Sequence, residues 1–322
     1  MTDRIVVLDG YTLNPGDISW SGLEEFGDVT VHDRTPEDAI IERASGARFV
    51  LTNKTPLSGG TLAALPDLAY IGVLATGYNV VDVAAAAERG VVVTNVPTYG
   101  TDSVAQHATA LLLELVRRPA IHADAVRRGD WSRSVDWCFT LAPIVELSGK
   151  TLGVIGIGRI GRAFARICAA MGMNIIAHDE FPPGPDELAG LEVEFTDVDD
   201  VFRRADVVTL HCPLTPATEH LVNAERLALM RADAYVINTS RGPLVDSRAL
   251  AAALAAGTIA GAGLDVLDEE PPPSTNPLLT APNCIVTPHI AWYARASRQR
   301  LMDSAVENLR AFVSGTPVNT VG

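Results

Sequence analysis

Short apolar runs alternate with amphipathic segments along most of the chain. In the first hundred residues the runs that predict strands are 5–8, 29–31, 49–51, 70–74 and 91–93. Segments with helical spacing, such as 36–45 and 81–90, lie between them. Alternation of this kind predicts a parallel sheet with helices on both faces.

A second alternating series begins near residue 150. It predicts strands at 152–155, 174–178, 207–210, 235–237, 262–264 and 284–286, with helices at 159–172, 195–205, 224–231 and 246–257. A long apolar helix at 102–118 precedes this series, and an amphipathic helix at 297–314 follows it. We therefore expect an α/β protein with two doubly wound parallel-sheet domains. One domain comprises 1–99 and 291–322, and the other, 100–290, is inserted into it.

Glycines mark the first turn of the second series. Gly156, Gly158 and Gly161 form G-x-G-x-x-G where the strand 152–155 meets a helix. The first glycine permits a tight turn, the second lets a pyrophosphate approach the backbone, and the third lets helix and strand pack closely. The N–H groups at the start of the helix then face the phosphates. The motif alone is weak, because glycine-rich turns are common.

An acidic residue strengthens this interpretation. Asp179 ends the next predicted strand, 21 residues after Gly158. A carboxylate there can accept hydrogen bonds from the hydroxyls of an adenosine ribose, and it repels a 2′-phosphate. Asp179 could also be an ordinary cap at the end of a strand. The order of strand, glycines, helix, strand and acid nevertheless predicts an NAD-binding Rossmann-type domain.

Composition excludes some classes of function. The formal net charge of −14 argues against a nucleic-acid or anionic-membrane partner. The four cysteines have no metal-ligand spacing, so we expect no metal site. No run is long enough to cross a membrane, and the first residues are acidic where a signal peptide is basic. We expect a soluble cytoplasmic protein.

Three groups that suit hydride transfer to a carbonyl follow the last three strands. Arg241 has a planar fork that can hold a carboxylate and a carbonyl oxygen. An acidic loop contains Glu270, and His289 follows the final strand. Each has a plainer interpretation: a surface arginine, a solvated loop, a structural histidine. His107 and His211 could support a site or simply pack.

Together these segments resemble the D-isomer-specific 2-hydroxyacid dehydrogenases over essentially the whole chain. The segments VAQHATALLL, GKTLGVIGIGRIG, LHCPLTPATEHLVN, INTSRGPLVD, GLDVLDEEPPP and TPHIAW follow in the order of that family. The resemblance implies that Arg241 binds substrate, that His289 donates the proton and that Glu270 pairs with it. In the first domain, ATGYNVVD resembles the substrate loop, with Thr76 and Gly77 meeting the carboxylate through backbone N–H groups.

The resemblance also implies the groups that contact the cofactor, NAD. Asp265 is similar to the residue near the nicotinamide carboxamide, although it could instead cap its own loop. The full set of expected cofactor residues is Gly156, Gly158, Arg159, Ile160, Gly161, Asp179, Cys212, Thr239, Asp265 and Ala291.

Within the family, the opening VVLDGYTLNPGDISW and TNKTPL near Lys54 are similar to the branch of glycerate dehydrogenases and hydroxypyruvate reductases. This implies NADH-dependent reduction of hydroxypyruvate, and of glyoxylate, by a homodimer. Trp131 and Trp137 lie in a segment that either packs in the subunit interface or reaches the active site of the partner. Two alternatives stay open: a broader 2-ketoacid reductase, and a dinucleotide-sensing binding protein similar to corepressors of this fold.

Overall fold

The protein, described here by a computed structural model that covers residues 2–322, forms two compact units. Unit 1 comprises Met1–Gly100 and Trp292–Gly322, and unit 2 comprises Thr101–Ala291. The boundaries expected from the sequence lie one residue before these. None of the helices formed by residues 2–322 is both long enough and apolar enough to cross a membrane.

Unit 1 is built on a parallel sheet of five strands in the order β2-β1-β3-β4-β5. This is the doubly wound, flavodoxin-like order. The strands are β1 (Arg4–Val7), β2 (Asp28–Val31), β3 (Phe49–Thr52), β4 (Tyr70–Val73) and β5 (Val92–Thr94). The helices are η1 (Gly10–Thr12), α1 (Ser21–Glu24), η2 (Glu37–Ala39), α2 (Ile40–Ala44), α3 (Gly59–Ala63), α4 (Val83–Glu88) and α11 (Arg295–Val313).

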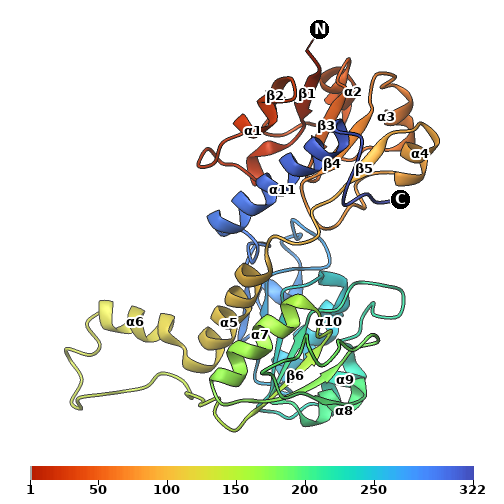
Figure 1. Cartoon of the computed structure of the whole chain (residues 1–322). Helices are drawn as coiled ribbons and strands as arrows, with labels where there is room; N and C mark the ends of the chain where they lie inside the picture. The colour runs from red at the N-terminus through yellow and green to blue at the C-terminus, as the bar shows by residue number, and fades with distance from the viewer. Residues whose placement is uncertain (1) are drawn as a thin grey trace. The chain divides into compact units, whose positions relative to one another are not determined.

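Successive residues of β1 enter different cores, because side chains alternate across a strand. Ile5 and Val7 pack in a core that includes Leu301 and Leu309 of α11, whereas Val6 packs in a second core with the helices α2 to α4. The C-terminal helix therefore completes one face of the N-terminal sheet (Figure 1).

An ion pair also fastens α11 to the first part of the chain. The nearly fully buried Arg298 donates to both oxygens of Asp17, at 2.6 and 2.7 Å, and to the backbone oxygen of Leu13. Hydrogen bonding from Arg298 lowers the pKa of the Asp17 carboxyl below its usual range. This two-pronged contact fixes the start of α11.

Unit 2 has a parallel sheet of seven strands in the order β12-β11-β10-β9-β6-β7-β8. The order reverses between β6 and β9, which is the Rossmann arrangement. The strands are β6 (Thr151–Ile155), β7 (Asn174–His178), β8 (Glu194–Phe195), β9 (Val207–Leu210), β10 (Tyr235–Asn238), β11 (Gly261–Leu264) and β12 (Cys284–Val286). The helices are α5 (Thr101–Arg117), α6 (Pro119–Arg127), α7 (Arg159–Ala170), α8 (Val198–Arg204), α9 (Ala224–Leu229), η3 (Gly242–Leu244), α10 (Ser247–Ala256) and η4 (Pro277–Leu279).

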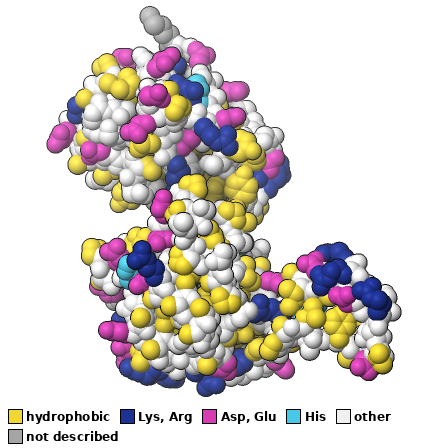
Figure 2. Space-filling view, turned by 180° about the vertical axis from the view of Figure 1, so that it is seen from behind, with side chains coloured by type: hydrophobic (Ala, Val, Ile, Leu, Met, Phe, Trp, Pro, Cys, Tyr) yellow, Lys and Arg dark blue, Asp and Glu magenta, His cyan; other side chains and the backbone are white. Residues whose placement is uncertain are grey.

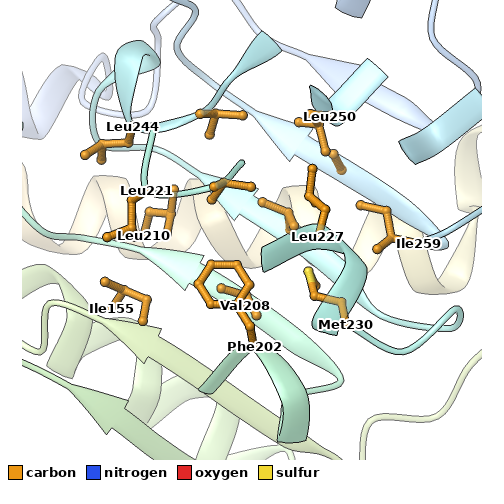
Figure 3. Close-up of a cluster of buried hydrophobic side chains, with 14 of the residues drawn as sticks. Ile155, Phe202, Val208, Leu210, Leu221, Leu227, Met230, Leu244, Leu250 and Ile259 are labelled. Atoms are coloured by element: carbon orange, nitrogen blue, oxygen red, sulfur yellow. The ribbon is translucent and has the colours of Figure 1, made fainter. Parts of the chain in front are cut away.

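Two cores cover the faces of this sheet. On one face Ile155, Phe202 and Val208 pack with residues from α9 and α10 (Figure 3). On the other, Val154 packs with α7 and with the long helix α5. Each large apolar side chain buried in this way contributes about 1.5–3 kcal/mol. Packing on both faces thus fixes the position of the sheet, and with it the carboxyl ends of its strands.

Three expectations need correction. The helix expected at 195–205 begins only at Val198, because Phe195 belongs to β8 and Asp197 caps the helix by accepting from the Asp200 N–H. The helix expected to reach 118 ends at Arg117, since Arg118 adopts a left-handed conformation with φ 54°. The pattern predicted no strand at β8 and none of the helices α1, α3 and α6.

Candidate active site

The glycine loop links β6 to α7 at the carboxyl edge of the sheet. Gly156 has φ +86°, and a Cβ atom there would lie 2.5 Å from the backbone nitrogen of Cys212. Glycine is therefore required at this turn. By contrast, a Cβ on Gly158 would meet nothing within 4 Å, so one side of this backbone is open. Gly158 is the N-cap of α7, and Arg159, Ile160 and Gly161 form its first turn.

Asp179 lies beside this loop, directly after β7. Its Oδ2 accepts from the Ile157 N–H at 2.7 Å, and its Oδ1 accepts from the Phe181 N–H at 2.9 Å. A carboxylate oxygen can accept more than one hydrogen bond, so both oxygens can still receive ribose hydroxyls. The open backbone, the helix N-terminus and this acid fit the phosphates and adenosine ribose of a dinucleotide.

The remaining cofactor candidates follow other strands. Cys212 lies two residues after β9, Thr239 follows β10 and Asp265 follows β11. Because the strands are parallel, their carboxyl ends share one edge. The buried Thr239 Oγ1 has no hydrogen-bond partner within residues 2–322, as expected of a group that meets a ligand. Burial raises the pKa of the Cys212 thiol to about 11, so it is an un-ionised thiol.

His289 and Glu270 form a close pair at the same edge. The His289 Nδ1 lies 2.6 Å from the Glu270 Oε2, and the Glu270 Oε1 accepts from the Leu267 N–H at 3.0 Å. The carboxylate is thus fixed by its own loop. A carboxylate on Nδ1 orients the imidazole and stabilises its protonated form. Both side chains are about one-third exposed, so solvent and substrate can reach them.

Arg241 stands in the loop after β10. Its side chain is exposed, and its Nη1 donates to the backbone oxygen of Ser240 at 2.8 Å. The next residue, Gly242, packs against the loop that carries Glu270: a Cβ on Gly242 would lie 1.8 Å from the Leu267 backbone oxygen. The loop that carries Arg241 and the loop that carries Glu270 therefore touch at Gly242 and Leu267.

Asp265 is almost wholly buried, with 1% exposure. Its carboxylate accepts from the N–H groups of Ile290 and Ala291, at 2.9 and 2.7 Å, and from the Thr287 hydroxyl at 2.6 Å. Burial opposes ionisation, but hydrogen bonds from His107, Thr287 and these N–H groups outweigh it and lower the pKa of Asp265. The side chain therefore caps its neighbouring loop, and its other expected role, near the nicotinamide, stays a prediction.

His211, which the sequence left undecided, serves the core. Its Nε2 lies 2.9 Å from the Thr209 Oγ1, and its ring meets the ring of Phe164 at 5.8 Å. Burial lowers the pKa of His211 to about 4, so the ring is neutral at physiological pH. It supports the strand end rather than a proton transfer.

Thr76 and Gly77 belong to unit 1, after β4, and so at the carboxyl edge of the other sheet. The Thr76 hydroxyl donates to the Val96 backbone oxygen at 2.8 Å, and the Asn95 amide donates to the Thr76 backbone oxygen at 2.7 Å. The backbone N–H groups of Thr76 and Gly77 have no hydrogen-bond partner among residues 2–322. Those residues also contain no cluster of three or more His, Cys, Asp or Glu that could hold a metal.

The fold and the glycine loop define a dinucleotide-binding α/β protein, and comparison with known proteins narrows the class. Residues 109–291 match the family described as D-isomer specific 2-hydroxyacid dehydrogenase, NAD binding domain. A hydroxypyruvate reductase of Blautia hydrogenotrophica is 48% identical over 321 residues, 99% of each chain. A glycerate dehydrogenase of Methylorubrum extorquens is 42% identical over 323 residues, covering 100% of this chain and 99% of the relative.

A solved structure extends the likeness to three dimensions. The NADPH-dependent glyoxylate/hydroxypyruvate reductase of Sinorhizobium meliloti, in complex with NADP and malonate, aligns with a TM-score of 0.83 and 32% identity. The alignment covers 100% of this chain and 97% of that one.

The chain belongs to the D-isomer-specific 2-hydroxyacid dehydrogenase family. It is an NAD-dependent oxidoreductase of that family, which confirms the fold class, the enzyme class and the cofactor expected from the sequence.

Proposed function

We propose that the protein reduces hydroxypyruvate to D-glycerate with NADH, and reduces glyoxylate to glycolate more slowly. The observation that carries the proposal is the 2.6 Å contact between His289 and Glu270, at the carboxyl edge of the same sheet that carries the glycine loop and Arg241. An oriented imidazole with a carboxylate on Nδ1 is a proton donor suited to a carbonyl that gains charge. The names of the two curated relatives cited above, a hydroxypyruvate reductase and a glycerate dehydrogenase, support the substrate.

The proton is the contribution of the enzyme's own residues. When bound, NADH supplies the hydride that reduces the carbonyl carbon. The carbonyl oxygen takes a proton from His289, through Nε2 because Nδ1 is bonded to Glu270. Glu270 stabilises the imidazolium before the transfer and keeps the ring oriented afterwards. In the reverse direction the neutral ring accepts the proton from the hydroxyacid.

The substrate carboxylate needs a cation and hydrogen-bond donors. We assign Arg241 as the cation, because its exposed fork can hold the carboxylate and polarise the carbonyl oxygen. We assign the N–H groups of Thr76 and Gly77 as the donors. Unit 1 is then the substrate-binding domain and unit 2 the NAD domain, with a D-2-hydroxyacid as product.

NADH is the preferred cofactor in this proposal because Asp179 would repel the 2′-phosphate of NADPH. The expected dinucleotide contacts are those of Gly156, Gly158, Arg159, Ile160 and Gly161, with Thr239, Cys212, Asp265 and Ala291 towards the nicotinamide. Family membership does not decide this preference, since the relative from Sinorhizobium meliloti is NADPH-dependent.

A homodimer in the cytoplasm completes the proposal. The segment that follows α5 projects from the body of unit 2 (Figure 1), and its surface carries hydrophobic and basic side chains (Figure 2). Its exposed apolar residues are Ile121, Val126, Trp131, Val135, Trp137, Leu141 and Ile144. Such a patch is expected to be covered by a second copy of the chain. Light scattering of the wild type and of Trp137→Ser tests this, with a shift towards monomer expected in the variant.

The substrate is tested by oxidation of NADH across a panel of 2-oxoacids. Pyruvate is the decisive comparison, because it differs from hydroxypyruvate only by the C3 hydroxyl. A site that hydrogen-bonds this hydroxyl penalises the analogue that lacks it. We expect hydroxypyruvate to have the highest kcat/KM, glyoxylate a lower value, and pyruvate and branched 2-oxoacids the lowest. A higher value for pyruvate or a branched acid would refute the substrate and leave the family assignment intact.

A further inference from the structure

Two side chains of the long helix α5 reach the turn that carries His289. We propose that Ser103 and His107 are positioning residues, which hold this turn in the geometry that proton transfer requires. The inference rests on the proposed function in one respect, namely that His289 is the proton donor. The structural part of the inference, that these side chains hold the turn, stands on contacts within unit 2 alone.

The contacts lie at both ends of the turn. The His107 Nε2 is 2.9 Å from the Thr287 Oγ1 and 3.3 Å from the Asp265 Oδ1. The Ser103 hydroxyl donates to the Ala291 backbone oxygen at 2.6 Å. Residues four apart lie on the same face of a helix, so Ser103 and His107 act together. Ser103 holds the end of the turn at residue 291, and His107 holds its start at residue 287.

Between these ends, the turn is held through Asp265. The N–H groups of Ile290 and Ala291 donate to its carboxylate, and the His289 N–H donates to its backbone oxygen at 2.8 Å. The backbone of His289 itself has φ +54°, in the left-handed region that costs a non-glycine residue free energy. A turn of this kind persists only where surrounding contacts hold it, and α5 supplies two of them.

The direction of the hydrogen bonds follows from the groups involved. Asp265 accepts only, because it is a carboxylate with a lowered pKa. The Thr287 hydroxyl has one proton, and it donates this proton to Asp265 at 2.6 Å. The Thr287 oxygen must therefore accept from His107, whose Nε2 carries the proton. Hydrogen bonds thus run from His107 to Thr287 and from Thr287 to the Asp265 carboxylate. The same carboxylate accepts from the N–H groups of Ile290 and Ala291.

This arrangement predicts which property changes when the hydrogen bond from His107 is removed. Without His107, the Thr287 hydroxyl loses its hydrogen-bond donor and Asp265 loses the contact with the imidazole at 3.3 Å, so the turn opens more often. His289 then spends less time in the position for proton transfer. A displacement of about 1 Å far from the reacting atoms can cost on the order of 100-fold in rate. We expect a fall of about tenfold or more in kcat, with a smaller change in KM for the 2-oxoacid.

The experiment compares four variants: His107→Ala, His107→Gln, Ser103→Ala and Thr109→Ala. Gln keeps an N–H donor near the position of the His107 Nε2, so it should restore the turn. Thr109 is the matched control, because it is a polar residue of α5 whose hydroxyl donates within the helix, to the Ala105 backbone oxygen. Amide hydrogen exchange, measured without substrate or cofactor, follows Ile290 and Ala291, while steady-state kinetics give kcat and KM.

We expect the amides of Ile290 and Ala291 to exchange about tenfold faster or more in His107→Ala and Ser103→Ala. Exchange in the strands β6 and β7 should stay unchanged. His107→Gln and Thr109→Ala should exchange at nearly the wild-type rate. Exchange within twofold of wild type in His107→Ala, or acceleration spread evenly over unit 2, would overturn the inference. Accelerated exchange with an unchanged kcat would also overturn it, because the held turn would not serve catalysis. A wild type that reduces no 2-oxoacid would refute the proposed function, and exchange would still decide whether the turn is held.

Discussion

Gly156 and Cys212 touch through their backbones: a Cβ on Gly156 would lie 2.5 Å from the Cys212 nitrogen and 2.7 Å from its Cα. Two strand ends, those of β6 and β9, therefore meet at a point where no side chain fits. This contact shapes the turn that leads into α7. Gly158, two residues later, has no such neighbour, so the two glycines serve different purposes.

The first prediction separates these purposes. Gly156→Ala should lower the Tm, because the new methyl group displaces the backbone at Cys212. Gly158→Ala should leave the Tm unchanged but weaken NADH binding, since its methyl group fills the space where a pyrophosphate approaches. We expect Kd to rise by about tenfold, equivalent to about 1.4 kcal/mol, in a fluorescence titration.

Gly184→Ala is the matched control, because a Cβ there also meets nothing within 4 Å. It should change neither the Tm nor the Kd. Equal Kd values for wild type and Gly158→Ala would show that the dinucleotide does not approach this backbone.

The second prediction concerns cofactor preference. Asp179→Asn should lower the ratio of kcat/KM for NADH to kcat/KM for NADPH. The reason is that it removes the repulsion between the Asp179 carboxylate and the 2′-phosphate of NADPH. Asn keeps an oxygen that can accept from the Ile157 N–H, so the glycine loop should stay in place. Asp179→Ala should narrow the ratio too, but with weaker binding of both cofactors, since the contact with Ile157 is lost. A ratio that is the same in all three proteins would assign the preference to another group.

The glycine loop was predictable from the sequence because its requirements are local. The strand, the turn and the first turn of the helix lie within about a dozen residues, and each glycine has a steric reason. The sheets were predictable for a similar reason: residues of β1 and β6 are buried on both faces, so their apolar runs are continuous. β8 was not, because Glu194 and Phe195 are both exposed and leave no apolar run.

The pair of His289 and Glu270 was reached only through family resemblance. The two residues are 19 positions apart, and their contact depends on how two loops fold at the edge of the sheet. The fit of Gly242 against the Leu267 backbone oxygen helps to set that geometry, and no periodicity reveals it. For His107 there was a usable signal, its spacing of four from Ser103 on a helix. The signal did not say what that face contacts.

The third prediction tests the proton donor. His289→Ala should lower kcat for reduction by about 100-fold or more, the usual scale of general acid catalysis. Glu270→Gln should retain more activity than His289→Ala but less than the wild type, because an amide orients the imidazole less firmly than a carboxylate does. The measurement is kcat and kcat/KM for the reduction of hydroxypyruvate in the wild type and both variants.

Glu269→Gln provides a control of the same charge change in the same exposed loop. Its kcat should equal that of the wild type. Equal kcat values for Glu270→Gln and the wild type would mean that the contact between Glu270 and His289 does not serve proton transfer.

The last prediction concerns stability and pH. The hydrogen bonds to Asp265 lower its pKa in the folded protein, although burial acts in the opposite direction. A carboxyl group with a lowered pKa stabilises the folded state fully above its unfolded pKa of about 3.9, and this stabilisation is lost as the pH falls through the folded value. Asp265→Asn should therefore be less stable than the wild type by about 1–3 kcal/mol at pH 7, the scale of buried charged hydrogen bonds. The difference should begin to shrink below about pH 4, where this carboxyl group is protonated in the unfolded chain but still ionised in the folded protein. Urea denaturation midpoints at pH 7, 5 and 3.5 measure the difference, with the exposed Asp186→Asn as a control that should match the wild type throughout. A difference that stayed constant down to pH 3.5, or grew, would mean that the charge on Asp265 does not stabilise the turn that carries His289.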